Sequence, residues 1–195
     1  SLAFYNCTGF NGNLMLPDAL TEIGAQAFIY CTGLTGDLII PDKITAIAPF
    51  AFYGCSGFTG NLVLPQNATT IGKAAFYKCT GLTGDLILPA QLTKIETQAF
   101  TYCSGFTGSL VIPNGVTTIE NAVFYDCHGF DGTLTLPNEV TSIEYAAFYN
   151  CSGLTGDLIL PTQLTEIGEY AFSTCPGFTG RLTIPDGVTT IAAYA

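Results

Sequence analysis

Residues 51–65, AFYGCSGFTGNLVLP, contain a pattern that recurs along the whole chain. A cysteine follows a phenylalanine by three residues, two glycines three apart come next, and a short apolar segment then ends at proline. The cysteines lie at 24-residue intervals, at positions 7, 31, 55, 79, 103, 127, 151 and 175. A fixed period of this length indicates one stack of similar units rather than conventional globular domains.

Composition limits the partners that the chain can have. Of its 195 residues, 48% are hydrophobic and 10% are charged, and the formal net charge is -10. The five Lys and Arg residues are dispersed singly, so the sequence offers no basic groove that could neutralise a nucleic-acid backbone. No apolar run approaches the ~18 residues of a membrane span. We therefore expect neither nucleic-acid binding nor membrane insertion by this segment.

The unit reads F-x-x-C-x-G-[FL]-x-G-x-L-x-[LI]-P-x-x-[LIVA]-T-x-I and recurs without an insertion. Leu38 and Ile40 alternate with Asp37 and Ile39, which is the period-two pattern of a short strand, and Pro41 ends it. When the units stack on one another, these strands predict a parallel sheet.

The segment after the strand predicts the opposite wall of each unit. In DALTEIGAQAFIYC (18–31) the apolar residues lie at offsets 0, 3, 7, 8 and 11, which is nearer to helical than to strand spacing, so we expect a helical or 3₁₀ turn. Glycine pairs such as Gly57 and Gly60 follow, where a positive φ or a close backbone approach is needed. Each apolar column packs on its copies in neighbouring units, and the phenylalanines from Phe4 to Phe172 form a spine.

These columns resemble the BspA-like leucine-rich repeats, whose unit reads roughly C-x-x-L-x-x-[IL]-x-[IL]-P-x-x-[VL]-T-x-I-G-x-x-A-F-x-x-C. The resemblance covers residues 3–195 and rests on I-x-x-x-A-F-x-x-C combined with L-x-[LI]-P. It implies an α/β repeat fold, a right-handed leucine-rich repeat solenoid of about eight 24-residue coils with the parallel sheet on its concave face. It also implies a secreted or cell-surface protein, often an adhesin, without catalytic residues.

Both ends of the sequence fall within a unit. The chain begins at LAFYNC and ends at TTIAAYA, and neither end shows the polar capping unit that repeat arrays normally need. We therefore expect residues 1–195 to form a single solenoid that is a fragment of a longer chain. Uncapped ends of this kind would also allow end-to-end self-association.

Eight cysteines in an extracellular protein ordinarily suggest four disulfides. In an in-register stack, however, copies of one column lie ~4.8 Å apart, whereas bridged Cβ atoms prefer ~3.8 Å. The CxxC pairs typical of structural zinc sites are absent from the sequence. We therefore predict that the cysteines are free and act as small buried hydrophobes, and that the protein holds neither a metal nor another cofactor.

The residues offer little support for catalysis. His128 is the only histidine, with Asp126 and Asp131 nearby, and a metal site or catalytic triad there would rest on one unit alone. The sequence also lacks a phosphate-binding loop, a nucleophile elbow and a dinucleotide fingerprint. We predict that the protein is not an enzyme and that His128 is a surface substitution.

Two columns of the predicted strand supply the candidate binding residues. If Leu38 and Ile40 point inward, Ile39 points outward, and its column forms an apolar stripe of the kind that often marks interaction sites. Alternatively, these β-branched residues simply favour strands. The polar column beside it forms either a solvated ladder or a weak calcium site. The predicted binding residues are Ile39, Val63, Ile87, Val111 and Ile159, with Asp37, Asp85 and Asp157 beside them.

A second candidate surface follows the phenylalanine spine on the turn side of each unit. Its residues are Tyr5, Tyr53, Tyr77, Tyr125 and Tyr149. Tyrosines in such a position either contact a protein or glycan, or shield the edge of the core. The sequons at Asn6, Asn67 and Asn150 are glycosylation acceptors only in a eukaryotic secretory pathway.

Together these observations predict a non-enzymatic, extracellular or cell-surface recognition module. It would bind host proteins, glycans or neighbouring cells through many weak contacts along a rigid array. The alternative is a structural stalk that displays another domain.

Overall fold

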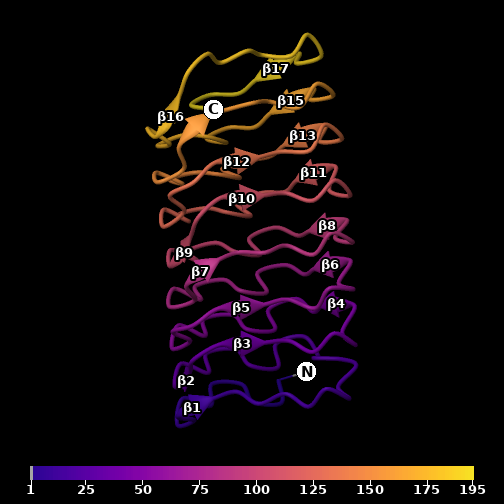
Figure 1. Ribbon diagram of the computed structural model, residues 1–195, viewed down its shortest axis with the longest axis vertical. Coiled ribbons are helices and arrows are strands. Elements are labelled where there is room, and N and C mark those ends of the chain that lie inside the picture. Colours follow the sequence, from indigo (N-terminus) through magenta and orange to yellow (C-terminus); the bar gives the residue numbers. More distant parts are fainter. Residues whose placement is uncertain (1) are drawn as a thin grey trace.

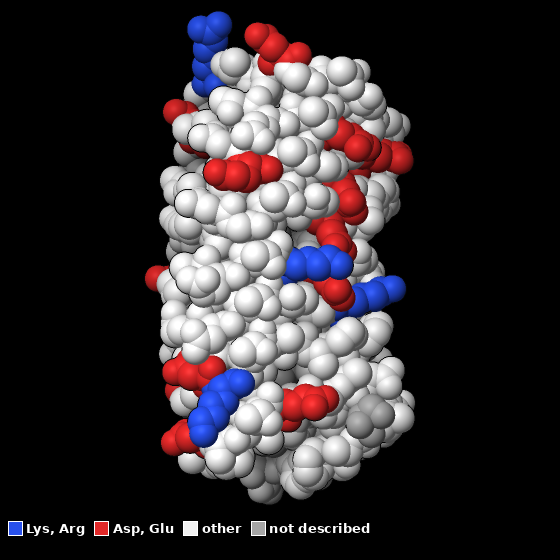
Figure 2. All heavy atoms as spheres, turned by 90° about the vertical axis from the view of Figure 1, so that its right-hand side faces the viewer, with Lys and Arg blue, Asp and Glu red and all other residues white. Residues whose placement is uncertain are grey.

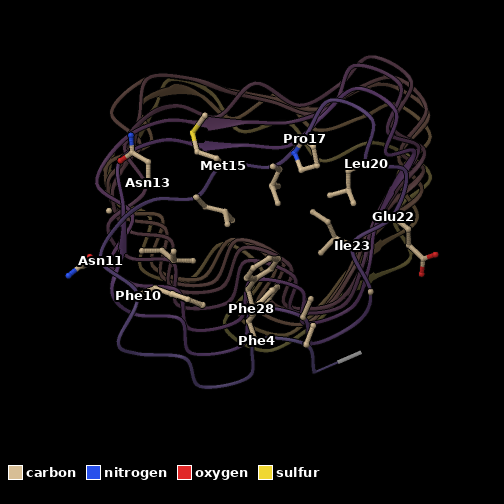
Figure 3. Close-up of a pocket in the computed structure, with 17 residues that line it drawn as sticks. Phe4, Phe10, Asn11, Asn13, Met15, Pro17, Leu20, Glu22, Ile23 and Phe28 are labelled. Atoms are coloured by element: carbon tan, nitrogen blue, oxygen red, sulfur yellow. The ribbon is translucent and has the colours of Figure 1, made fainter.

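The computed structural model describes residues 2–195 as a column of stacked coils that rises from the N-terminal coil at the bottom of Figure 1. Viewed along the column in Figure 3, each coil has four sides. One side carries Met15 and Pro17, the next carries Leu20 and Glu22, and the spine, represented by Phe28, lies opposite the first. This is a parallel β-solenoid of about eight coils with a 24-residue spacing.

The strands are two residues long and form three sets. The first set lies at the glycine corner and contains β1 (Gly12–Asn13), β2 (Leu34–Thr35), β7 (Gly84–Asp85), β9 (Phe106–Thr107), β14 (Gly156–Asp157) and β16 (Phe178–Thr179). The second set lies on the predicted strand side and contains β3 (Leu38–Ile39), β5 (Leu62–Val63), β10 (Leu110–Val111) and β12 (Leu134–Thr135). The third set contains β4 (Ala46–Ile47), β6 (Thr70–Ile71), β8 (Lys94–Ile95), β11 (Thr118–Ile119), β13 (Ser142–Ile143), β15 (Glu166–Ile167) and β17 (Thr190–Ile191).

The third set forms the most continuous ladder, although the sequence predicts a helical or 3₁₀ turn there. Strands β4, β6 and β8 form one parallel sheet, and β11, β13, β15 and β17 form another along the right-hand side of Figure 1. Each residue pairs with the one 24 positions later, as Ile47 does with Ile71. Both isoleucines are buried, so the T-x-I motif supplies one strand wall of the core.

The spine side also differs from the prediction, because residues 2–195 contain no helix. These residues therefore include no helix that could cross a membrane. The N–H of Phe52 donates to the carbonyl of Ala75 in the next coil, at 2.9 Å, rather than to its own coil. Two residues per coil have positive φ, as do Ala74 (50°) and Lys78 (56°). A helix requires consistently negative φ, so these residues interrupt it and turn the N–H groups toward the neighbouring coil.

The phenylalanine spine packs inside the column along the side opposite Met15 and Pro17. From Phe4 to Phe172, neighbouring ring centroids lie 5.2–5.7 Å apart. Phe52, Phe76 and Phe100 are fully buried. Offset stacking of this kind adds to the free energy gained by removing the rings from water.

The cysteines are free, as the sequence predicts. Each thiol from Cys31 to Cys175 donates a hydrogen bond of 2.8–3.1 Å to the carbonyl of the phenylalanine 27 residues earlier. Burial raises the pKa of the Cys55 thiol to about 12 and that of Cys79 well above its ordinary value. These thiols therefore stay protonated and join adjacent coils as weak donors.

The two glycines of the unit serve different purposes. A side chain at Gly57 would collide with the carbonyl oxygen of Thr32 in the preceding coil, so this glycine allows the close approach of two backbones. The second glycine has positive φ in several coils, as at Gly84 (72°). Both needs are the ones expected from the sequence.

Candidate functional site

The predicted apolar residues form an exposed row along the side of the second set of strands, which we call the strand stripe. Its members Ile39, Val63, Ile87, Val111 and Ile159 are 44–74% exposed. Their neighbours along the chain are buried, as at Leu62 and Leu64, or partly buried, as at Leu158. Strand alternation therefore separates core residues from surface residues within three positions.

Open grooves lie beside members of the strand stripe. One groove of about 510 Å³ contains Ile159, Arg181 and Thr183. Another of about 600 Å³ is lined in part by Val63 and Ile87. A partner side chain could enter either groove beside the apolar row.

The predicted polar residues Asp37, Asp85 and Asp157 are exposed beside the stripe. The Oδ1 atom of Asp37 accepts a hydrogen bond from the backbone N–H of Asn61 at 2.7 Å. A side chain at Gly108 would collide with Asp85 in the preceding coil. This column thus forms a ladder between coils, and residues 2–195 contain no cluster of His, Cys, Asp and Glu suited to a metal ion.

Tyrosine rings form a second continuous row on the spine side, which we call the tyrosine ladder. Neighbouring ring centroids lie 4.5–6.2 Å apart. The ladder consists of Tyr30, Tyr53, Tyr77, Tyr102, Tyr125, Tyr149, Tyr170 and Tyr194. Burial, followed by the neighbouring tyrosines, raises the pKa of Tyr53 to about 12, so its hydroxyl stays neutral.

Half of the tyrosines in this ladder cannot be predicted from one position of the repeat. Tyr53 follows the spine phenylalanine by one residue, whereas Tyr30 and Tyr102 follow it by two and Tyr170 precedes it by two. The ring of Tyr30 lies against Gly54 of the next coil, where a side chain would collide with it. The signal in the sequence is that every coil keeps at least one tyrosine within a few residues of the spine phenylalanine.

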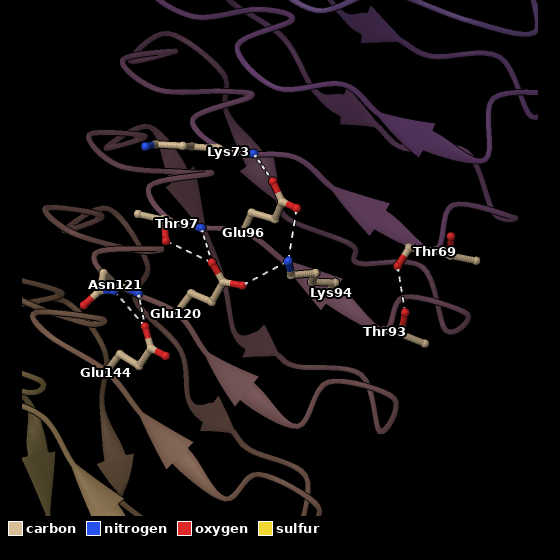
Figure 4. A network of polar contacts seen from close by, with 9 residues as sticks. All are labelled: Thr69, Lys73, Thr93, Lys94, Glu96, Thr97, Glu120, Asn121 and Glu144. Carbon is tan, nitrogen blue, oxygen red and sulfur yellow. Dashed lines mark hydrogen bonds and ion pairs between the residues drawn. The ribbon is translucent and has the colours of Figure 1, made fainter.

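A column of glutamates, which we call the carboxylate column, lies on the outer surface beside the third set of strands. The repeat pattern of the sequence does not reveal it, because the column occupies only three consecutive coils. Glu96, Glu120 and Glu144 lie at 24-residue spacing, and each accepts a backbone N–H from a residue 23 positions earlier, at 2.7–3.1 Å (Figure 4). Lys94 lies between two of them, with its Nζ 3.2 Å from Glu96 and 3.5 Å from Glu120. These carboxylates raise the pKa of Lys94, the hydrogen bond to Glu96 having the largest effect.

His128 lies on the surface, with its Nδ1 3.5 Å from Oδ1 of Asp126. Asp131 is engaged elsewhere, because its Oδ1 accepts the N–H of Gly108 at 2.8 Å. The two aspartates that accompany His128 in the sequence therefore do not converge on it.

A pocket of about 490 Å³ opens at the N-terminal end of the column (Figure 3). Phe4, Phe10, Phe28 and Ile23 point into it, whereas Glu22 points away. In the inner coils the equivalent surface is covered by the neighbouring coil, so this pocket is the open end of the core.

Known structures resemble this fold. A crystal structure of a leucine rich cell surface protein from Faecalibacterium prausnitzii A2-165 is 30% identical, with a TM-score of 0.73, covering 87% of this chain and 46% of that one. A leucine-rich repeat protein from Bacteroides ovatus ATCC 8483 is 24% identical, with a TM-score of 0.70, covering 92% and 52%. The chain thus spans about half the length of these two proteins. No curated protein sequence matches it.

The family comparison agrees with the fold. Residues 1–131 and 130–195 match the family described as BspA type Leucine rich repeat region, in six copies. The chain therefore belongs to the BspA-type leucine-rich repeat family.

Proposed function

We propose that this protein is a non-catalytic recognition module at a cell surface, and that the strand stripe binds a protein or glycan of a host or neighbouring cell. The observation that carries the proposal is the row of exposed Ile39, Val63, Ile87, Val111 and Ile159 along a rigid column. Large apolar side chains repeatedly exposed on one face are typical of interaction surfaces. The description of the F. prausnitzii protein as a cell surface protein supports the location.

Many weak contacts along the column would supply the affinity. Each coil that contributes to the stripe offers one apolar side chain and one polar side chain, as Ile87 and Asp85 do. A partner that spans several coils gains from all of them at once, because the column already fixes their spacing.

The test is a binding screen of extracellular-matrix proteins and a glycan array with the wild type and the Val63→Arg/Ile87→Arg variant. We expect a saturable interaction that the double variant loses while it keeps its fold by circular dichroism. The charge-matched control is Gln91→Arg/Gln163→Arg, at two exposed positions outside the stripe. Equal binding by all three proteins would place the binding surface on another face, and no binding at all would instead support the structural stalk.

A further inference from the structure

The rings of the tyrosine ladder meet in two ways. Three pairs are stacked, and each joins residues 24 positions apart in successive coils. These stacked pairs are Tyr53 with Tyr77 at 4.5 Å and 6°, Tyr125 with Tyr149 at 4.7 Å and 13°, and Tyr170 with Tyr194 at 5.0 Å and 3°. The contacts that connect the pairs to Tyr30, to Tyr102 and to one another are edge-on, at 75–90°. The ladder is therefore a row of separate stacked pairs.

The two rings of a stacked pair start from equivalent backbone. The N–H of Tyr125 donates to the carbonyl of Ala122 at 3.3 Å. One coil later, the N–H of Tyr149 donates to the carbonyl of Ala146 at 3.1 Å, in the same turn. Coils stacked in register repeat about every 4.8 Å. The two phenol rings therefore extend in the same direction, which brings the ring carbons beside their oxygens close together.

The stacked pairs can be reached from solvent, whereas the thiols cannot. Tyr125 and Tyr149 are partly exposed, while Cys127 and Cys151 are fully buried. Burial also raises the pKa of the Cys151 thiol well above its ordinary value, so the reactive thiolate does not form at neutral pH. An oxidant at the surface of the column therefore meets the tyrosine rings first.

Two adjacent phenols can be joined by oxidation. Loss of one electron and the hydroxyl proton converts each phenol into a phenoxyl radical. The two radicals form a carbon–carbon bond between the ring carbons beside their oxygens, and the hydrogens of these carbons move to the oxygens, which restores both rings as dityrosine. The pair loses two electrons and two protons in total. A peroxidase transfers them to one molecule of hydrogen peroxide, which becomes two molecules of water.

The charges beside the stacked pairs differ. The Nζ atom of Lys78 lies 5.6 Å from the ring centroid of Tyr77. Asn150, which is neutral, occupies the equivalent position next to Tyr149. A positive charge beside a ring opposes the removal of an electron, because it is attracted by the ring electrons. Tyr53 and Tyr77 are therefore the pair that is harder to oxidise.

The charge of the surrounding coils acts in the same direction. Residues 51–122 contain three Lys and three Asp or Glu, a net charge of zero, whereas residues 123–194 contain Arg181 and eight Asp or Glu, a net charge of -7. On the side of the third set of strands, carboxylates gather over the upper, C-terminal coils (Figure 2). A negative field favours the loss of an electron from the rings in these coils.

We propose that the stacked pairs are sites of oxidative cross-linking, where hydrogen peroxide and a peroxidase join the tyrosines of successive coils as dityrosine. Tyr125 and Tyr149 are linked before Tyr53 and Tyr77. Each link closes a loop of the chain, restricts the unfolded state and so stabilises the column. The links lie on the spine side and leave the strand stripe free, so they do not depend on the proposed binding function.

The test treats dilute folded protein with a heme peroxidase and limiting hydrogen peroxide, and detects dityrosine by its fluorescence and by mass spectrometry of digests. Trypsin separates Tyr53 from Tyr77 by cleaving after Lys73, and glutamyl endopeptidase separates Tyr125 from Tyr149 by cleaving after Glu144. We expect linked peptides that are lighter than their sum by two hydrogen atoms, within one chain. The linked protein should also unfold at a higher urea concentration.

Conservative variants separate stacking from simple proximity. Tyr149→Phe keeps the ring but removes the phenol, so it should abolish the second link and leave that between Tyr53 and Tyr77. Tyr102→Phe removes a phenol that meets Tyr77 and Tyr125 edge-on, and should leave both links. Lys78→Met should accelerate the link between Tyr53 and Tyr77, whereas Lys73→Met, which removes an equal charge outside the ladder, should not.

Three results would overturn the proposal. Links to Tyr102 as abundant as those within the stacked pairs would show that stacking does not select the product. The same links in protein unfolded in urea would show that the fold is not needed, and links only between chains would show that the stacked rings do not couple. A link between Tyr53 and Tyr77 that forms first, at a rate unchanged by Lys78→Met, would refute the order assigned from the charges.

Discussion

Residues 51–122 and 123–194 are two three-coil blocks with nearly the same core and different surfaces. Cys79 and Cys151 are equivalent positions, as are Phe76 and Phe148, and all four are fully buried. The surface columns differ, so that the net charge falls from zero in the first block to -7 in the second. The comparison teaches that the inward columns maintain the stack, while the outward columns are free to acquire recognition chemistry.

The largest expected effect is a loss of stability at alkaline pH. It tests whether the cores of the two blocks are equivalent. Burial raises the pKa of Cys79, Cys103, Cys127 and Cys151 well above the ordinary value, so the folded protein keeps thiol protons that the unfolded chain loses. The free energy of unfolding should therefore be fully retained below about pH 8.5 and fall by about 1.4 kcal/mol per buried cysteine for each further pH unit, until the pKa of the folded state is reached. Urea unfolding at a series of pH values measures this slope.

Cys79→Ala and Cys151→Ala should reduce that slope by equal amounts. A stability that stays constant from about pH 8.5 to 10.5 would show that the thiols are not buried in the folded protein. Unequal effects of the two variants would instead show that the two blocks differ in their cores.

Truncation of the phenylalanine spine should have the next largest effect. Phe76→Ala and Phe148→Ala each remove a fully buried ring from the stack, and each should lower the free energy of unfolding by about 3–5 kcal/mol. Urea unfolding followed by circular dichroism measures the loss, with the exposed Gln91→Ala as the control. A negligible loss at one of the two positions would break the equivalence of the blocks.

The smallest expected effect concerns the carboxylate column at the boundary of the blocks. Lys94 pairs with Glu96 and Glu120, whereas the equivalent position one coil later is Thr118, beside Glu120 and Glu144. Thr118→Lys should raise the free energy of unfolding by less than about 1 kcal/mol, because the pairs are solvent-exposed.

The gain from Thr118→Lys should diminish in high salt, which screens exposed ion pairs. Gln91→Lys, at an exposed position away from the carboxylate column, is the control. An equal gain from both substitutions would indicate a general effect of net charge rather than pairing with Glu144.

The tyrosine ladder shows which contacts the repeat positions of the sequence predict and which they do not. Tyr53, Tyr77, Tyr125 and Tyr149 share one column and are found by spacing alone. Tyr102 belongs to another column, and only the fold shows that its ring centroid lies 5.5 Å from that of Tyr125 in the next coil. The strand stripe is easier to anticipate, because strand alternation assigns its side without knowledge of other coils.

The sequence by itself determined the 24-residue period, the apolar columns, the free cysteines and the outward position of Ile39 and its equivalents, since these depend on spacing and on neighbours along the chain. Only the tertiary structure decided that the T-x-I segments form strands and that the spine side is not helical. The reason is that the N–H of Phe52 finds its acceptor in Ala75, on the next coil. A local pattern of apolar residues cannot distinguish that partner from one within its own turn.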